Sequence, residues 1–226
     1  MLLNLLKRPL QKLIKTEVDK VINDLLHPTV EIVSLDNAIP KYATPGDAGA
    51  DILMGNLSRI QTKFMKGAYI VTYKSKLYAQ LDDALAANDT DKVNEINRLI
   101  DTAETKVDFP YELHIKPGGH CLVPTGIFTS FPDNYVADII PKSGLALKKR
   151  ITITNSPGKV DARYKNEWGI IVDNESDEDF ILRQGDYVCQ VQFSLKCQAQ
   201  FVQKESVEDL SGTDRGGGFG AHSHNV

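Results

Sequence analysis

Cysteine is scarce in this chain of 226 residues, which contains only Cys121, Cys189 and Cys197. Their spacing matches no metal-binding pattern, and an odd number of cysteines cannot all pair within one chain. The sequence therefore excludes a disulfide framework and a cysteine-rich metal site. Free thiols are typical of a reducing compartment, so we expect the protein in the cytoplasm.

Long hydrophobic runs and an excess of positive charge are also absent. No apolar stretch approaches the length that crosses a bilayer, so we expect no membrane-spanning segment. The net charge of −4 excludes a broad basic surface of the kind that holds nucleic acid. The net charge does not exclude binding of a small phosphorylated ligand, because such binding needs only a few local cations. The chain has no internal repeat, and its composition is ordinary for one globular domain with an insertion.

Residues 1–28 carry the pattern of an amphipathic helix. No acidic residue precedes Glu17, and residues 1–15 are basic and leucine-rich, which loosely resembles a transit peptide. Charges fill the face opposite a set of apolar residues at helical spacing: Leu10, Leu13, Ile14, Val18, Val21, Ile22 and Leu25. We expect this helix to pack on its own protein or on a neighbouring subunit. Acidic residues 17, 19 and 24 count against attachment to a membrane surface.

Residues 55–107 differ from the chain on either side in the spacing of their apolar residues. Two apolar stripes at helical spacing, separated by a capping segment at 88–90, predict an inserted helical hairpin. The stripes are Leu77, Tyr78, Leu81, Ala84 and Leu85, and then Val93, Ile96, Leu99, Ile100 and Ala103.

The flanking segments, residues 29–54 and 108–210, read as β-structure. Short alternating runs are separated by Pro, Gly, Asn and Asp turns, which is typical of an antiparallel sandwich or barrel. Residues 211–226 are glycine-rich and polar, and we expect them to be mobile in the free protein. The expected strands are residues 30–34, 111–115, 121–123, 135–140, 151–154, 168–173, 180–182 and 187–193.

Two stretches hold the residues best suited to chemistry on a nucleotide. Residues 155–164, with the sequence Asn-Ser-Pro-Gly-Lys-Val-Asp-Ala-Arg-Tyr, place Asp161 and Tyr164 beside exposed backbone. A carboxylate there can take a proton from water, although a lone Asp in a loop is more often an Asx turn. Tyr164 could stack against a sugar or be a half-buried strand aromatic. Residues 215–220, Arg-Gly-Gly-Gly-Phe-Gly, could close over a triphosphate.

Weaker signals lie elsewhere. Residues 141–146, Pro-Lys-Ser-Gly-Leu-Ala, could form an anion nest or an ordinary strand-to-helix turn with Ser143 as its cap. Asp51 could organise a hydrated Mg²⁺ or be a solvated turn acid. Gln190 alone would pass as a polar strand residue. His222 and His224 resemble a metal pair, but tail histidines without supporting carboxylates are better read as solvated.

Taken in order, these segments resemble the five motifs of the dUTPase family of trimeric nucleotide hydrolases. The resemblance covers residues 30–53 and 107–226, and the third and fifth motifs are the specific ones. It implies a mainly β, dUTPase-like antiparallel barrel of jelly-roll type, with an inserted helical hairpin and an N-terminal helix. The motifs are residues 47–52, 141–146, 158–164, 185–190 and 215–220.

The resemblance also implies a reaction and a role for each matching residue. The reaction is Mg²⁺-assisted hydrolysis of dUTP to dUMP and pyrophosphate, which limits uracil in DNA and supplies dUMP. Asp161 would orient the attacking water. Asn155 and the backbone at Gly158, Lys159 and Val160 would read uracil, and Tyr164 would lie under the deoxyribose.

At the phosphate end, Asp51 would support the Mg²⁺ shell through water. Residues 215 and 219 would close the site, and the ring would stack on uracil. Each site would be shared by three subunits of a homotrimer. The phosphate-binding residues would be Lys142, Ser143, Gly144 and Gln190, and those of the closing strap would be Arg215, Gly218, Phe219 and Gly220.

The chain departs from the family pattern at three points. Lys142 stands where the second motif usually has Arg, so charge is kept without a bidentate grip. The fifth motif is one residue shorter between Arg and Phe than its commonest form. Ala221 and His222 replace the usual hydroxyl residues, and this leaves Ser223 as a substitute.

Two other functions remain as alternatives. A dCTP deaminase shares the fold, but its usual basic-Ser-Ser segment does not match residues 141–145. A regulatory binding protein could instead capture a partner through residues 55–107, with nucleotide as a switch.

Overall fold

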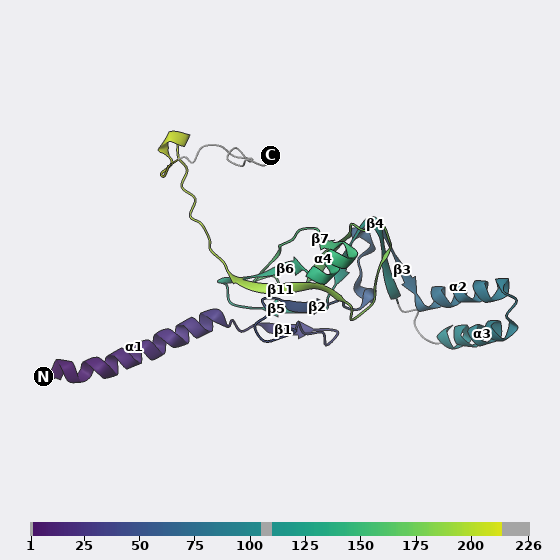
Figure 1. Cartoon of the computed structure of the whole chain (residues 1–226), viewed down its shortest axis with the longest axis horizontal. Coiled ribbons are helices and arrows are strands. Elements are labelled where there is room, and N and C mark those ends of the chain that lie inside the picture. Colours follow the sequence, from purple (N-terminus) through teal and green to yellow (C-terminus); the bar gives the residue numbers. More distant parts are fainter. Residues whose placement is uncertain (1, 105–109, 214–226) are drawn as a thin grey trace. The chain divides into compact units, whose positions relative to one another are not determined.

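A computed structural model describes residues 2–104 and 110–213 (Figure 1). The chain divides into two compact units, residues 1–196 and 197–226. The first unit contains the sheets and the helices α1 to α4. In the second unit, the described part is mostly irregular and includes the 3₁₀ turn η3, Val207–Asp209.

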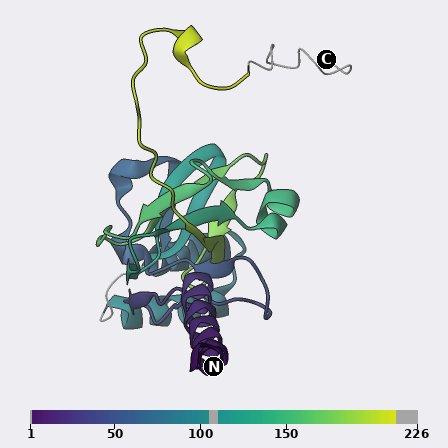
Figure 2. The ribbon, with the colours of Figure 1, turned by 90° about the vertical axis from the view of Figure 1, so that its left-hand side faces the viewer.

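The first unit is built on antiparallel sheets, which Figure 2 shows in a second view. A four-stranded sheet has the order β2-β11-β6-β8, a five-stranded sheet has the order β10-β4-β9-β7 with β3 also paired to β4, and β1 pairs with β5. The prediction of a mainly β, antiparallel fold is therefore confirmed. The strands are β1 Glu31–Ser34, β2 Ala50–Leu53, β3 Met65–Thr72, β4 Pro110–Pro124, β5 Ile127–Ser130, β6 Tyr135–Pro141, β7 Ile151–Ile153, β8 Gly158–Asp161, β9 Gly169–Asn174, β10 Phe180–Leu182 and β11 Tyr187–Leu195.

The core lies between the sheets because the strands alternate buried and more exposed residues. Along β6, for example, Tyr135, Ala137 and Ile139 are buried, and the residues between them are only partly buried. The single tryptophan, Trp168, is also buried in this core. Other fully buried members of the core are Ile52, Met54, Leu57, Leu113, Ile115, Val123, Ile127, Ile170, Val172, Leu182 and Val191.

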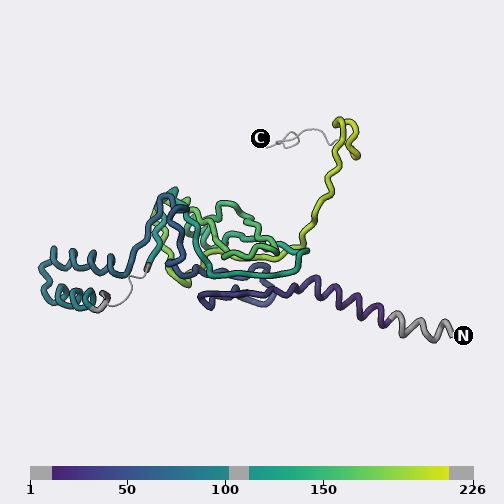
Figure 3. Tube along the Cα trace, turned by 180° about the vertical axis from the view of Figure 1, so that it is seen from behind, coloured from purple at the N-terminus to yellow at the C-terminus, as the bar shows by residue number. Residues whose placement is uncertain are grey.

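The helical hairpin spans fewer residues than the predicted insertion 55–107. It consists of α2, Tyr73–Ala86, and α3, Thr90–Glu104, which lie side by side (Figure 3). Residues 55–72, assigned to the same insertion from their sequence, are not helical in this way: they form the 3₁₀ turns η1, Leu57–Arg59, and η2, Thr62–Phe64, followed by β3. Leu57 is buried in the barrel core, and β3 pairs with β4, so these residues extend the barrel.

The hairpin has a small hydrophobic core of its own. Two residues from each helix are buried in it, and Leu81 and Val93 pack against them. A capping box between Thr72 and Ser75 begins α2. Asp89 accepts a hydrogen bond from the Lys92 amide at 3.0 Å, so it caps α3 as the sequence suggests. The four buried residues are Leu77, Ala84, Ile96 and Ile100.

The N-terminal helix α1, Leu2–Leu26, forms over the predicted residues. Residues 12–26 are all exposed, so the described part of its apolar stripe does not pack on its own chain. The Tyr135 hydroxyl donates a hydrogen bond to the Leu25 carbonyl at the end of the helix. Within the described residues, no helix is both long and apolar enough to span a membrane.

Candidate functional site

Three of the predicted residues meet at one end of the four-stranded sheet. Asp51 on β2 lies opposite Gln190 on β11, and Lys142 follows the end of β6. The Asp51 Oδ1 atom accepts hydrogen bonds from the Lys142 Nζ atom at 2.5 Å and from the Gln190 Nε2 atom at 3.0 Å. Asp51 is only 8% exposed, so its charge is balanced by a lysine in a partly desolvated place. We call Asp51, Lys142 and Gln190 the Asp51 cluster.

Small residues before β2 allow this cluster to assemble. A Cβ atom at Gly49 would lie 3.1 Å from the Gln190 Cβ atom, so glycine lets the two strands approach closely. Just upstream, the Asp47 carboxylate holds the turn by accepting hydrogen bonds from the Thr44 hydroxyl at 2.6 Å and the Thr44 amide at 2.8 Å. These bonds lower the pKa of Asp47.

The phosphate-binding candidates Ser143 and Gly144 form the first turn of α4, Ser143–Lys149. Lys142 is the N-cap residue of this helix, so the alternative reading of Ser143 as its cap is wrong. A Cβ atom built on Gly144 would meet nothing within 4 Å, so this backbone faces open space. The Asp51 cluster and the start of α4 therefore place a cation, a hydroxyl and accessible backbone next to one another.

The residues of the third motif lie on β8 and the turn after it. Gly158 is buried, and a Cβ atom there would lie 3.1 Å from the Asn155 amide nitrogen and 3.4 Å from the Ile139 Cβ atom. Asp161 ends β8 with its side chain exposed. Its carbonyl accepts the Tyr164 amide at 3.0 Å, and this turn leaves Tyr164 42% exposed. Hence Asp161 and Tyr164 face solvent from the same turn.

The Lys159 side chain is paired with a carboxylate on the neighbouring strand β6. Its ammonium forms an ion pair with the Asp138 carboxylate, which also accepts a hydrogen bond from the Ser194 hydroxyl at 2.7 Å. Burial alone would raise the pKa of Asp138, but the bonds from Lys159 and Ser194 outweigh it and lower that pKa. A ligand at this hairpin would thus meet the backbone of Lys159 and Val160 more readily than the lysine charge.

The two groups of residues lie at opposite ends of β6. Asp161 pairs with Val136 near the start of the strand, whereas Gln190 pairs with Ile140 near its end. Lys142 lies six residues beyond Val136, which corresponds to about 20 Å along an extended strand. One chain therefore does not bring Asp161 next to Lys142.

The fifth-motif candidates Arg215, Gly218, Phe219 and Gly220 lie outside the described residues, as do His222 and His224. Among residues 2–104 and 110–213, no three or more His, Cys, Asp or Glu side chains gather as a direct metal site. A hydrated Mg²⁺ still fits Asp51, because Mg²⁺ keeps several waters and is commonly held by one carboxylate together with substrate phosphates. Oδ1 of Asp51 is shared by Lys142 and Gln190, which leaves Oδ2 for a water of such an ion.

An ionic cluster around a buried carboxylate was not predicted from the sequence. Glu112 on β4 is 5% exposed, and its Oε1 atom accepts bonds from Arg183 at 2.6 and 3.1 Å and from Lys76 at 3.2 Å. The His114 Nε2 atom lies 3.0 Å from Oε2. Burial alone would raise the pKa of Glu112, but these hydrogen bonds lower it to about 2. We call these four residues the Glu112 cluster; it links α2 to the barrel.

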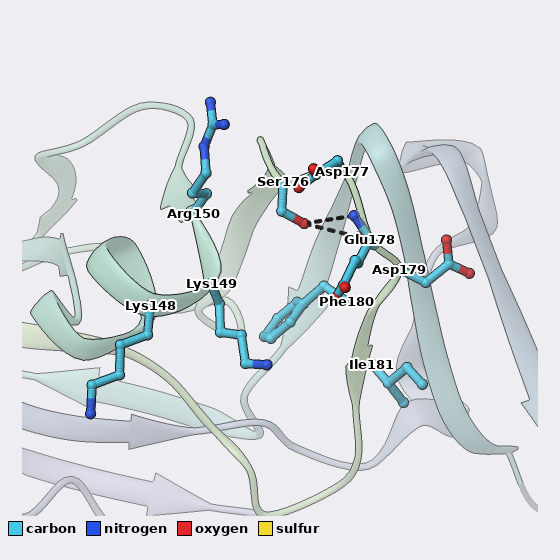
Figure 4. A pocket seen from close by; sticks show the side chains of 9 residues that line it. All are labelled: Lys148, Lys149, Arg150, Ser176, Asp177, Glu178, Asp179, Phe180 and Ile181. Carbon is cyan, nitrogen blue, oxygen red and sulfur yellow. Dashed lines mark hydrogen bonds between the residues drawn. The ribbon is translucent and has the colours of Figure 1, made fainter.

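A charged cleft of about 360 Å³ was also not predicted (Figure 4). Residues 148–150, which are basic, line it from the end of α4, and residues 176–181 line it from the loop before β10 and from β10 itself. The Ser176 hydroxyl donates to the Glu178 carbonyl at 2.9 Å and accepts the Glu178 amide at 3.3 Å. The cleft lies at the far end of α4 from Ser143, so it is separate from the Asp51 cluster.

A third feature is an apolar groove of about 550 Å³. Ile32, Val191 and Phe193 are among the residues that line it, together with Thr129 and Trp168. The Thr129 hydroxyl and the Trp168 Nε1 atom are buried, and within the described part of the chain neither has a hydrogen-bond partner. A buried polar atom without a partner is costly, and the chain itself already shields these two atoms from solvent.

Sequence comparison identifies the family. A family model described as dUTPase matches residues 106–221, just over half of the chain. The deoxyuridine 5'-triphosphate nucleotidohydrolase of Caulobacter vibrioides is 42% identical over 108 residues, which are 47% of this chain and 68% of that protein. The enzyme of the same name from Syntrophotalea carbinolica is 44% identical over 110 residues, 48% of this chain and 73% of that protein. The chain belongs to the dUTPase family.

Solved structures agree with this dUTPase assignment at the level of the fold. Two structures of the dUTPase of Staphylococcus bacteriophage 80alpha with dUpNHpp are each 16% identical to this chain, with TM-scores of 0.50 and 0.52. The alignments cover 81% and 85% of this chain and 92% and 98% of the phage chains. The matched family region includes the segments predicted as the second to fifth motifs, whereas residues 47–52 and α2 precede it.

Proposed function

We propose that this dUTPase hydrolyses dUTP to dUMP and pyrophosphate at sites that two or more copies of the chain build together. Membership of the dUTPase family supports the reaction. The observation that carries the shared site is the separation of Asp161 from Lys142 along β6. Uracil and deoxyribose would bind at the turn of residues 155–164 of one copy, and the phosphates at the Asp51 cluster of another.

The exposed carboxylate of Asp161 accounts for the chemical step. It accepts a proton as a water oxygen attacks the α-phosphorus in line with the bond to the bridging oxygen of the β-phosphate. The new bond joins water oxygen to α-phosphorus, the bridging bond breaks, and pyrophosphate leaves with its electron pair. Lys142, Ser143, Gly144 and Gln190 bind the phosphate chain and orient it for this attack. When bound, Mg²⁺ would neutralise charge on the triphosphate.

At the other end of the substrate, the exposed ring of Tyr164 lies under the deoxyribose and excludes a 2′-hydroxyl. Asn155 and the backbone near Gly158 and Val160 read the uracil edge. Residues 215–220 close the site, with Arg215 on phosphate and Phe219 on uracil. These roles follow the family resemblance, and the positions of the described residues on one turn support them.

A homotrimer is the assembly that we propose. The apolar groove supports it, because a second copy could bury this apolar surface. The three cysteines are free, and two of them are buried, which suits the cytoplasm.

Complementation between two inactive variants tests the shared site. Asp161→Asn and Lys142→Met chains are unfolded, mixed in equal amounts and refolded together, and pyrophosphate release from dUTP is measured. If Asp161 and Lys142 of one site come from different subunits, random mixing restores about a quarter of the sites. If each site lies within one chain, the mixture stays as inactive as its components. Parallel assays with dCTP, dTTP and UTP test the substrate, and preferential turnover of dCTP would contradict the proposal.

A second candidate function is protein binding by the inserted hairpin. Tyr78, Leu85 and Leu99 belong to the predicted apolar stripes, yet each is at least 40% exposed. Exposed aromatic and aliphatic side chains on one helical hairpin suit a protein partner. Comparing the proteins retained by the full chain with those retained by a variant without residues 73–109 tests this function. It is compatible with dUTP hydrolysis.

A further inference from the structure

The ammonium group of Lys142 is held from two sides. Its Nζ atom lies 2.5 Å from the Asp51 Oδ1 atom and 4.7 Å from the centroid of the Tyr187 ring. A cation this close to an aromatic face is attracted by the negative charge above the ring. Tyr187 is 54% exposed and hence is not explained as a core residue.

A tight turn before β11 fixes the place of Tyr187. The Asp186 carboxylate accepts the Arg183 amide at 2.7 Å, and Gly185 adopts a φ of 87° that favours glycine. Met54 anchors the turn to the end of β2 through two hydrogen bonds. Its amide donates to the Asp186 carbonyl at 2.8 Å, and its carbonyl accepts from the Gly185 amide at 2.8 Å. The register then shifts between Tyr187 and Cys189. Such an irregularity can re-aim a side chain, and here the ring lies beside Lys142.

The chemistry of the ring suits a lysine that must bind phosphate. A lysine ends in a compact charge on a flexible stem, so a single hydrogen bond to Asp51 leaves it considerable freedom. A second carboxylate would restrain it, but would also occupy another N–H group and repel phosphate oxygens. An aromatic face restrains the ammonium without negative charge and leaves its other N–H groups for the ligand.

We propose that Tyr187 is a positioning residue that holds the Lys142 ammonium ready for the phosphate chain. This inference rests on the proposed phosphate-binding role of Lys142. Tyr187 acts through the face of its ring, so phenylalanine can replace it. It has no role in recognising uracil or deoxyribose.

A comparison of two substitutions in the full-length enzyme tests this role. Tyr187→Leu removes the ring, and Tyr187→Phe keeps it. We expect Tyr187→Leu to weaken binding of dUpNHpp and to raise KM for dUTP by about two- to fivefold, the effect of a solvent-accessible cation–π contact. Tyr187→Phe should bind as the unsubstituted enzyme does. Binding of deoxyuridine, which has no phosphate, should be equal in all three proteins.

A double-mutant cycle with Lys142→Met separates a positioning role from a structural one. If Tyr187 acts through Lys142, Tyr187→Leu has no further effect on dUpNHpp binding once Lys142 is replaced. The inference is overturned if the loss persists in that background, if Phe is as damaging as Leu, or if deoxyuridine binding falls equally. Any of these outcomes would contradict the role of Tyr187 without contradicting the proposal that the enzyme hydrolyses dUTP. Failure of the unsubstituted enzyme to hydrolyse dUTP would instead contradict the proposed function.

Discussion

Replacing Glu112 with glutamine should destabilise the enzyme by removing the negative centre of the Glu112 cluster. Glu112 is almost fully buried on β4 and receives bonds from Lys76, His114 and Arg183. The side chains differ little in shape, so the change removes charge without leaving a cavity. Lys76 and Arg183 are 38% and 50% exposed, so both can be solvated once the charge is gone.

The pKa of Glu112 sets the size of the effect. Its fall from the ordinary value of 4.5 to about 2 corresponds to about 3 kcal/mol of stabilisation when the carboxylate is ionised. Lys76 and Arg183 are both more than a third exposed, and solvent screens such pairs, so we expect Glu112→Gln to lower the free energy of unfolding by about 1–3 kcal/mol at pH 7.

The same carboxylate predicts how stability depends on pH. A group whose pKa is lower in the folded protein stabilises the fold above its unfolded pKa. That contribution is therefore present above about pH 4.5 and is lost as the pH falls towards 2. The difference between the unsubstituted enzyme and Glu112→Gln should be large at pH 7 and should shrink progressively between pH 4.5 and 2.

Urea unfolding at a fixed protein concentration measures this difference, because assembly would make stability depend on concentration. Asp177→Asn is the matched control, since it removes the same charge from an exposed carboxylate. It should change the free energy of unfolding by less than about 0.5 kcal/mol. A Glu112→Gln effect as small as that of the control, or one that is unchanged at pH 3, would refute the reasoning.

Three further predictions concern Asp161, the C-terminal residues 211–226 and the inserted hairpin. Asp161→Asn should still bind dUpNHpp but lower kcat by about 10²–10⁴-fold, and a near-normal kcat would remove Asp161 from the mechanism. Truncation before Ser211 should leave a folded assembly, measured by size and circular dichroism, with severely reduced kcat/KM for dUTP; full activity would show that residues 211–226 have no role in the reaction. Replacing residues 73–109 with a two-residue turn should preserve dUTP hydrolysis, because Thr72 and Pro110 are register partners that such a turn can join, whereas a folded but inactive product would place the hairpin in the site.

The sequence revealed β6, β7, β9, β10 and β11, where short alternating runs lie between turn residues, but it did not reveal β5 or β8. It failed at β4, which it divided at residues 116–120. The strand continues because two glycines let β3 and β4 approach: a Cβ atom at Gly119 would lie 2.5 Å from the Gly67 carbonyl oxygen. Glycines that read as a turn therefore mark a close contact between strands, which requires knowledge of the partner strand.

The sequence predicted the parts of the candidate site that depend on neighbouring residues. It did not predict the parts that depend on contacts between residues far apart in the chain. Neighbouring residues suggested the turn that exposes Asp161 and Tyr164. The ion pair of Lys159 with Asp138 joins different strands, and Glu112 meets Lys76 and Arg183 from distant parts of the chain. Alternation would place Glu112 on the face opposite the buried residue Leu113 and so predict an exposed acid, and nothing local indicates its burial or its partners.

The position of β8 explains why copies of this chain would have to cooperate. Hydrogen bonds between β6 and β8 fix Asp161 beside Val136, and the same strand β6 carries Lys142 beyond its other end. Moving both residues of one chain to a single α-phosphate would require breaking that ladder and exposing the core beneath it. In the proposed assembly, rotation about a symmetry axis would instead bring Asp161 of one copy towards Lys142 of the next without disturbing either sheet. The rigidity that separates these residues within a chain would thus hold them in a defined geometry across the interface.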